Sequence, residues 1–121
     1  MATFMKFGTI KGWATETGHV GWIPLAAVSL FPEGTRGAAV SAVICTRHRD
    51  GSTIHLWEAG ATGDSADAVI ELTKGNTVYL KIMLQRAMIT SFHVSADSSA
   101  SMEQLTLNFA KIEFDPGDVK L

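Results

Sequence analysis

Apolar side chains occupy every second position through much of this chain. The longest such run consists of Val78, Leu80, Ile82 and Leu84, with Tyr79, Lys81, Met83 and Gln85 between them. Since successive side chains of a strand point to opposite faces, this spacing predicts a strand with one apolar face. The alternation continues from Met88 to Val94, with the even-numbered residues as the apolar set. We therefore predict a second strand after a bend near Arg86 and Ala87.

Two further strands are expected around this central pair. Residues 68–73 predict a strand that a turn at residues 74–76 joins to the next one, because Gly and Asn tolerate positive φ. Near the C-terminus the apolar positions are odd-numbered up to Phe109 and even-numbered from Ala110. This slip predicts a β-bulge or a sharp bend, and the Asp-Pro-Gly sequence at 115–117 is expected to end the strand.

The N-terminal half has a less regular pattern. Residues 3–11 and 21–30 predict a pair of strands joined by the polar loop 13–20. Pro24 favours an edge or bulged position for the second strand, because proline cannot donate a ladder hydrogen bond. Such an edge is able to pair across a subunit boundary. Residues 40–46 predict a third strand.

One segment has the features of a helix. We predict it over residues 53–59, with Ser52 as its N-cap and Gly60 as its C-terminal stop. A helix of two turns is only marginally stable in isolation, so packing through Leu56 and Trp57 is expected to hold it in place. The expected fold class is mainly β: a compact antiparallel β-barrel of two curled sheets, with about seven to nine short strands and one short α-helix, as a single domain over residues 1–121.

The composition indicates apolar surface beyond what one small core uses. Hydrophobic residues make up 46% of the chain and charged residues 18%, below the roughly 25% of an average soluble domain. Apolar residues also occur on both faces of strands, as with Val69 beside Ala68 and Ile89 beside Met88. Contiguous exposed apolar patches mark contacts with partners. Self-association is the simplest interpretation.

Charge and hydropathy exclude several other classes. The net charge is -2 with no basic run, which argues against nucleic acid as a partner. The longest uncharged stretch, residues 17–32, contains Gly and Pro and is too short to cross a bilayer as a helix, so no membrane insertion is expected. Residues 1–11 lack the pattern of a signal peptide, which predicts a cytoplasmic start and another route for any export. Cys45 has no partner for an intrachain disulfide and is predicted to be a passive buried thiol.

Two short motifs resemble those of enzymes. Gly63-Asp64-Ser65 is similar to the nucleophile segment of GDSL-type hydrolases, which need a histidine to activate the serine. Here Ala66 stands where Leu belongs and no Asp-x-x-His follows, so residues 60–67 are better explained as a polar loop. The glycine-rich stretch Gly34–Gly37 lacks the ending of a phosphate loop and predicts a hairpin connection with Arg36 exposed.

Metal chemistry is also poorly supported. The four histidines are His19, His48, His55 and His93, and their spacing matches no metal motif, so they are expected at the surface or half-buried. The pairs Asp64 with Asp67 and Asp115 with Asp118 do not fit a calcium loop and are interpreted as solvated turn carboxylates. We expect no catalytic, cofactor-binding or metal-binding residue, and no cofactor.

The C-terminal residues resemble a known family. Residues 102–114 contain a Glu, an alternating apolar run, the sequence Asn-Phe-Ala-Lys-Ile and an acidic-aromatic ending. This segment closely resembles the last strand of the haemolysin-coregulated proteins (Hcp) of type VI secretion. Other similar segments follow in the family's order: Phe7–Gly12 (its opening strand), His19–Leu30 (its second strand, with a Gly-Trp-Ile start), Ser52–Gly63 (its short helix) and Val78–Val94 (its central strands).

The resemblance implies a non-enzymatic tube subunit. It implies six-membered rings with an open centre that stack into a tube, carry small effector proteins, meet spike and sheath proteins, and leave the cell without a signal peptide. Many members have a long arm that seats one ring on the next, whereas the loop Phe31–Gly37 is short here. The resemblance therefore supports ring formation more strongly than stacking, and a related phage-tail-like contractile system is an open alternative.

Two further alternatives have testable features. A small β-barrel binding module would use a concave apolar pocket lined by Trp13, Trp22 or Trp57. A hydrolase would depend on Ser65 as its nucleophile.

Overall fold

The computed structural model describes residues 2–31, 41–49, 51–75, 77–96 and 101–115, which form eight strands and one helix. The strands are β1 (Ala2–Phe7), β2 (Ile23–Leu25), β3 (Ala27–Phe31), β4 (Ala42–His48), β5 (Ser65–Lys74), β6 (Thr77–Ala96), β7 (Ser101–Asn108) and β8 (Lys111–Asp115), and the helix is α1 (Thr53–Thr62). Every strand pairing is antiparallel in this part of the chain. The predicted mainly β class is confirmed.

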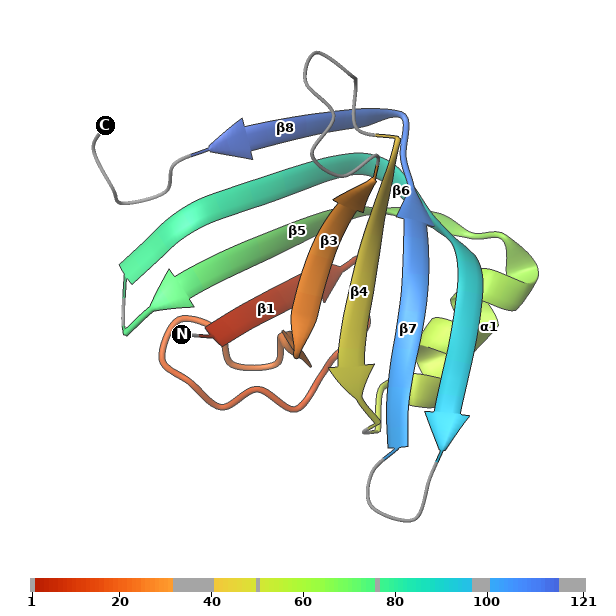
Figure 1. Ribbon diagram of the computed structural model, residues 1–121, viewed down its shortest axis with the longest axis horizontal. Helices are drawn as coiled ribbons and strands as arrows, with labels where there is room; N and C mark the ends of the chain where they lie inside the picture. The colour runs from red at the N-terminus through yellow and green to blue at the C-terminus, as the bar shows by residue number, and fades with distance from the viewer. Residues whose placement is uncertain (1, 32–40, 50, 76, 97–100, 116–121) are drawn as a thin grey trace.

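The strands belong to one sheet that curls into two layers. Its order is β2-β1-β5-β6-β7-β4-β3, and β8 pairs with β6 beside this path. In Figure 1 the first half of β6 runs alongside β8, β5 and β1, while its second half runs alongside β7 and β4, which cross the first layer steeply. Among the described strands the path from β2 to β3 is open, so the two curled layers are present without closure into a barrel.

The bend predicted in the middle of the central run lies at Arg86. This residue has φ 54, and its N–H donates to Asp67 Oδ1 at 3.2 Å. The chain continues as one 20-residue strand through the bend rather than as two strands. It does so because β6 exchanges partners there: residues 81–85 pair with β8, and pairing with β7 begins at Met88.

The bend also changes which residues face the core. Leu84 is buried before it, whereas Ala87 and Ile89 are buried after it and Met88 is 38% exposed. The predicted apolar set of even-numbered residues from Met88 to Val94 is therefore wrong at its start. The left-handed conformation at Arg86 shifts the alternation by one residue, and alternation alone does not reveal such a shift.

The slip near the C-terminus is a sharp bend between two strands. Strand β7 ends at Asn108 and β8 begins at Lys111, and between them Ala110 N–H donates to Gln85 O at 2.9 Å. Strand β7 thus pairs with the second half of β6, and β8 pairs with its first half. Asp115 ends β8, and residues 116 and 117 of the predicted turn lie outside the described residues.

The N-terminal pair of strands is present, with the second strand divided. Strand β1 pairs with β2 in the register Phe4 to Pro24, and β2 lies at an end of the strand order, as Pro24 predicted. At Ala26 the chain passes to the other layer, where its N–H donates to Thr46 O at 2.7 Å. The predicted strand at 40–46 is β4, which begins at residue 42, and Val40 is outside the described residues.

Helix α1 is longer than predicted. Ser52 stands at the N-cap position as expected, but the helix passes Gly60 and ends before Gly63, which has φ 74 and donates its N–H to Ala59 O at 3.1 Å. At Gly60 the helix instead comes close to β6, since a Cβ there would lie 3.2 Å from Ile89 Cγ2. Gly60 therefore permits close packing of helix and sheet rather than ending the helix.

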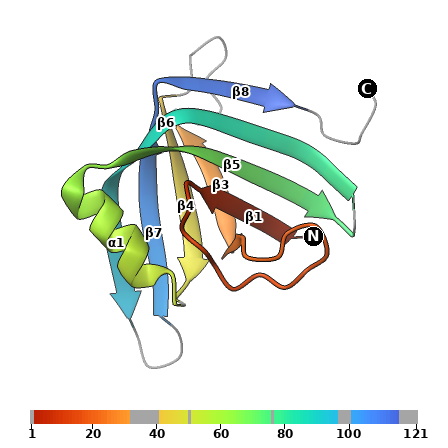
Figure 2. The same cartoon turned by 180° about the vertical axis from the view of Figure 1, so that it is seen from behind.

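Only one of the two predicted helix anchors is correct. Leu56 is fully buried, whereas Trp57 is 53% exposed. Figure 2 shows α1 beside the second half of β6, and contacts between these two elements hold it there. Leu56 is therefore the one fully buried anchor of this helix.

The core lies between the two layers. Its largest fully buried apolar residues include Met5, Ile23, Ile70, Ile82 and Leu84 from one layer and Val43, Leu105 and Leu107 from the other. Cys45 lies among them, and burial raises the pKa of its thiol to about 12. The predicted burial of the Cys45 thiol is therefore confirmed.

Candidate functional surfaces and buried polar clusters

The hydrolase-like motif lies on an exposed strand start. Ser65 is the first residue of β5, and both Ser65 and Asp64 are exposed. Ser65 hydrogen-bonds to none of the histidines, all of which are within the described residues. The polar loop predicted over 60–67 is shorter than expected, because the helix extends to Thr62 and β5 starts at Ser65. The residues needed to activate a serine do not come together here.

The candidate metal ligands are scattered. His48, His55 and His93 are exposed, as are Asp64, Asp67 and Asp115. Across the described ranges no three His, Cys, Asp or Glu side chains are placed to hold one metal ion. Asp118, Arg36 and the stretch Gly34–Gly37 lie outside the described residues.

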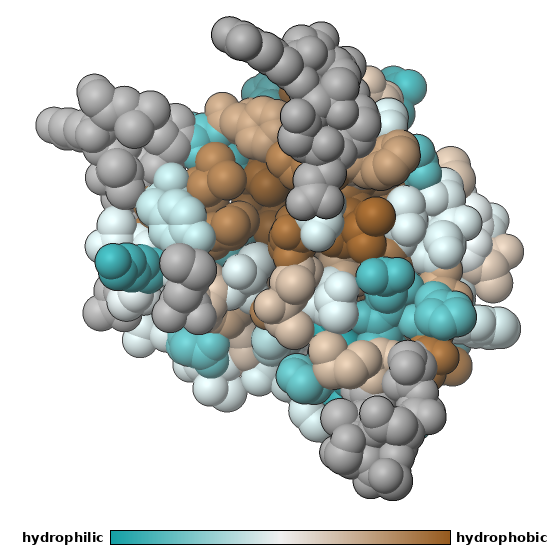
Figure 3. Space-filling model, viewed as in Figure 1, coloured by the Kyte–Doolittle hydropathy of each residue, from teal (hydrophilic) through white to brown (hydrophobic). Residues whose placement is uncertain are grey.

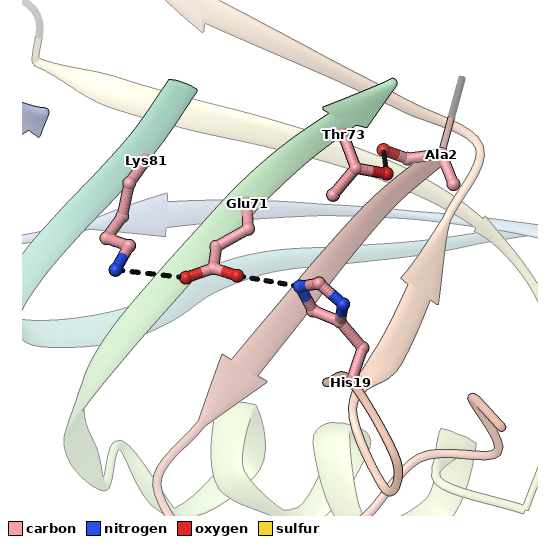
Figure 4. A network of polar contacts seen from close by, with 5 residues as sticks. All are labelled: Ala2, His19, Glu71, Thr73 and Lys81. Carbon is pink, nitrogen blue, oxygen red and sulfur yellow. Dashed lines mark hydrogen bonds and ion pairs between the residues drawn. The ribbon is translucent and has the colours of Figure 1, made fainter. Parts of the chain in front are cut away.

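His19 differs from the expected surface or half-buried position, because it is buried, with only 8% of its area exposed. Its Nε2 lies 2.6 Å from Glu71 Oε1, and Glu71 Oε2 lies 3.2 Å from Lys81 Nζ. Figure 4 shows this network joining the loop between β1 and β2 to β5 and β6. The imidazole also stacks on Phe4 with ring centroids 4.4 Å apart and meets Trp22 edge-on at 4.9 Å.

The network fixes the β1–β2 loop to the outer face of the sheet. Phe4, Glu71 and Lys81 are cross-strand neighbours in one row, so they present one surface to the loop. The loop turns tightly enough for this because Gly12 has no side chain: a Cβ there would lie 2.4 Å from Trp22 O. No sequence pattern indicates this cluster, since its members meet only once the register is known.

A second buried polar cluster joins α1 to the other layer. Arg47 and Glu103 lie directly opposite each other on β4 and β7, with 0% and 1% of their areas exposed. The Thr53 hydroxyl, in the first residue of α1, donates to Glu103 Oε1. A carboxylate is favourable near a helix N-terminus, where the helix dipole is positive. The odd-numbered position of Glu103, in phase with Leu105 and Leu107, was the available sequence signal that it faces inward.

The three tryptophans line three different surface hollows. Trp13 lines one of about 470 Å³, Trp22 one of about 630 Å³ and Trp57 one of about 150 Å³. The first two adjoin across residues 9–11, which line both. Trp13 is 68% exposed, so it is a surface side chain more than a pocket wall.

Apolar side chains remain at the surface in quantity, as the composition indicated. The large ones are Trp13, Val20, Phe31, Ile54, Trp57, Met88, Val94 and Phe114. Figure 3 shows an apolar area in the middle of one face, where β3 crosses in front of β5 and β6. Half-buried Leu30, Leu72 and Leu80 belong to these three strands and pack against the core. Such area is available for contacts between molecules.

Fold and surfaces together define a curled antiparallel β protein whose buried polar groups hold elements together and whose outer strands remain partly apolar. Residues 4–115 match the family model described as type VI secretion system effector, Hcp. The chain belongs to the Hcp family. No curated protein matches the sequence, and no helix in the described ranges is long and apolar enough to span a bilayer.

Solved structures share this fold at low identity. Hcp2 from Salmonella typhimurium is 20% identical with a TM-score of 0.82, over 94% of this chain and 84% of that one. A type VI secretion system effector from Yersinia pestis is 18% identical with a TM-score of 0.80, over 97% and 99%. Secreted protein Hcp3 from Pseudomonas aeruginosa is 17% identical with a TM-score of 0.79, over 96% and 92%. The predicted family and fold are confirmed.

Proposed function

We propose that the chain is a structural, non-enzymatic subunit of the type VI secretion tube, acting as a single domain over residues 1–121. Six copies close into a ring with an open centre, and rings stack into a tube that carries small effector proteins. Spike and sheath proteins are its other partners. The protein starts in the cytoplasm and leaves without a signal peptide through the secretion system. The family match over residues 4–115 is the observation that carries the proposal.

The distribution of apolar side chains supports assembly. Val20, Phe31 and Phe114 are 74%, 57% and 48% exposed, although the core is already filled by other residues. A ring subunit needs two lateral surfaces besides its own core, and these side chains supply apolar area for them. Strand β8 has β6 as its one neighbour in the described sheet, so its outer edge is open for pairing with another chain.

The buried polar groups support a structural role over a catalytic one. Catalytic groups must meet a substrate in a concave, accessible site. His19 and Glu71 instead contact each other under the β1–β2 loop, and Glu103 contacts α1 inside the fold. The proposal includes no catalytic residue, metal or cofactor.

Native mass spectrometry and negative-stain microscopy of the purified protein test the proposal. We expect a species of six subunits and ring-shaped particles with a central opening. A monomer at micromolar concentration without rings would contradict it. Ring stacking is tested separately by searching the same grids for tubes. The sequence predicts a short loop at Phe31–Gly37, most of which lies outside the described residues, and a short loop there would disfavour stable stacking.

The hollow beside Trp22 favours one second candidate, a ligand-binding module. This hollow of about 630 Å³ has both lysine and apolar walls, which suits a small amphipathic ligand. A change in tryptophan fluorescence on titrating a ligand into a monomeric protein would support it. Assembly into rings with no such response would exclude it.

A further inference from the structure

One layer of the sheet ends differently on its two sides. Its strands lie in the order β2, β1, β5, β6, β8. On one side β8 pairs only with residues 81–85 of β6, and within the described chain no strand lies beyond it. On the other side β2 covers only Thr3–Met5 of β1 and ends before Lys6. At Lys6 a hollow takes the place of a neighbouring strand.

This hollow is basic and partly apolar. Lys6 and Lys11 line it together with Ile10, Val20 and Trp22, and no carboxylate is among the residues that line it. Both lysines are exposed and neither forms an ion pair with a described residue. The side chain of Val20 is 74% exposed. The hollow therefore suits an acidic segment that also carries an apolar side chain.

Strand β8 is such a segment. It carries Glu113 and Asp115, both exposed, and Phe114 between them is 48% exposed. Glu113 contacts Lys111 at 2.9 Å, but both side chains are about half exposed or more, so this ion pair is weak and exchangeable. Among the described strands β8 is a sheet edge, and such an edge offers backbone groups for pairing with another chain.

The two surfaces lie in one row of the sheet. Lys6 is opposite Val69, Val69 is opposite Met83, and Met83 is opposite Glu113. Directly opposite residues point to the same face, so Lys6 begins and Glu113 ends a row across four strands. When a second copy lies beside the first so that this layer continues from β8 of one to β1 of the other, Glu113 of one copy comes toward Lys6 of the next. Opposite charges then face each other.

We propose that neighbouring copies join by placing strand β8 of one copy at the hollow beside Lys6 of the next, with Glu113 facing Lys6. The inference rests on the proposed ring and names its lateral contact. The contact is heterologous, because two different patches meet, and such contacts close into rings when the rotation between copies permits.

Charge reversal tests the contact. Lys6→Glu and Glu113→Lys each place like charges opposite each other, which disfavours the contact. Each variant alone should require at least about a tenfold higher subunit concentration for assembly. The double variant, and an equal mixture of the two single variants, should assemble as the wild type does. Lys74→Glu and Glu58→Lys, exposed residues away from both surfaces, are matched controls and should not change assembly.

Disulfide trapping gives an independent readout. A variant with both Lys6→Cys and Glu113→Cys should form a ladder of linked subunits on mild oxidation, whereas either substitution alone should not, because Cys45 is buried. Wild-type rings combined with normal assembly of both charge variants and no ladder would overturn this contact while leaving the proposed function intact. A wild-type protein that forms no rings would contradict both the proposed function and this contact. Circular dichroism of each variant confirms that its fold is retained.

Discussion

At the scale of single residues, two buried polar contacts join elements that are distant in the sequence. His19 reaches Glu71 at 2.6 Å across 52 positions, and Thr53 reaches Glu103 across 50. A buried polar group without a partner is costly, so each such pair fixes one relative position of two elements. The two clusters therefore specify where the β1–β2 loop and the helix lie.

Glu71→Ala should destabilise the fold, because Glu71 contacts both His19 and Lys81. We expect a loss of about 1.5–3 kcal/mol in the free energy of unfolding, as for hydrogen bonds that involve charged groups. Urea unfolding followed by circular dichroism measures it. Lys111→Ala removes the exposed pair with Glu113 and serves as the control, with an expected loss below about 1 kcal/mol. Equal losses in the two variants would show that the buried network adds nothing.

Cys45 should make stability depend on pH in the alkaline range. Burial raises its pKa from 9.0 to about 12, so above pH 9 the unfolded chain loses a proton that the folded chain keeps. The associated stability is fully present below pH 9 and is lost as the pH rises toward 12. Wild type should lose about 1.4 kcal/mol per pH unit more than Cys45→Ala in this window. Urea unfolding of both proteins between about pH 8 and about pH 10.5 measures the difference in slope. Parallel slopes would contradict the prediction.

At the scale of elements, α1 depends on one anchor. Leu56→Ala should lower the free energy of unfolding by about 2–5 kcal/mol, because it leaves a cavity at a fully buried position. Trp57→Ala should cost much less despite the larger side chain, since Trp57 is half exposed. Thermal unfolding of both variants compares them. A larger loss for Trp57→Ala would mean that the helix packs through its other side.

Local patterns predicted the strands well and their partners poorly. Alternation located β5, β6 and β7 because each has a buried face over several residues. It failed after Arg86, where a left-handed residue shifts the alternation. The helix-end signal failed at Gly60, where glycine allows close approach to Ile89 instead of ending the helix. In both places the deciding contact comes from an element distant in the sequence, which a local pattern does not contain.

The surfaces were predicted only in general terms. The low charge, and the strands with apolar residues on both faces, indicated more apolar surface than the core uses. The C-terminal motif indicated the family. The row from Lys6 to Glu113 and the cluster around His19 were not predictable, because both depend on the register of β1, β5 and β6. Register is set by pairing across the whole sheet, so single positions give no signal for it.

At the scale of the whole molecule, assembly and stability should be linked. If the folded subunit binds other copies and the unfolded chain does not, mass action raises the stability of the folded state. The Tm of the wild type should therefore rise with protein concentration. Lys6→Glu, which weakens the proposed contact, should show a Tm that changes little over the same range. Differential scanning calorimetry over about a hundredfold concentration range measures both, and a constant wild-type Tm would speak against assembly.

The continuity of β6 has a mechanical consequence. Because one unbroken strand belongs to both layers, the layers are joined by backbone as well as by packed side chains. A force applied to either layer reaches the other along covalent bonds and backbone hydrogen bonds, which yield less than packed side chains do. We therefore expect a particle built this way to resist shear between its halves.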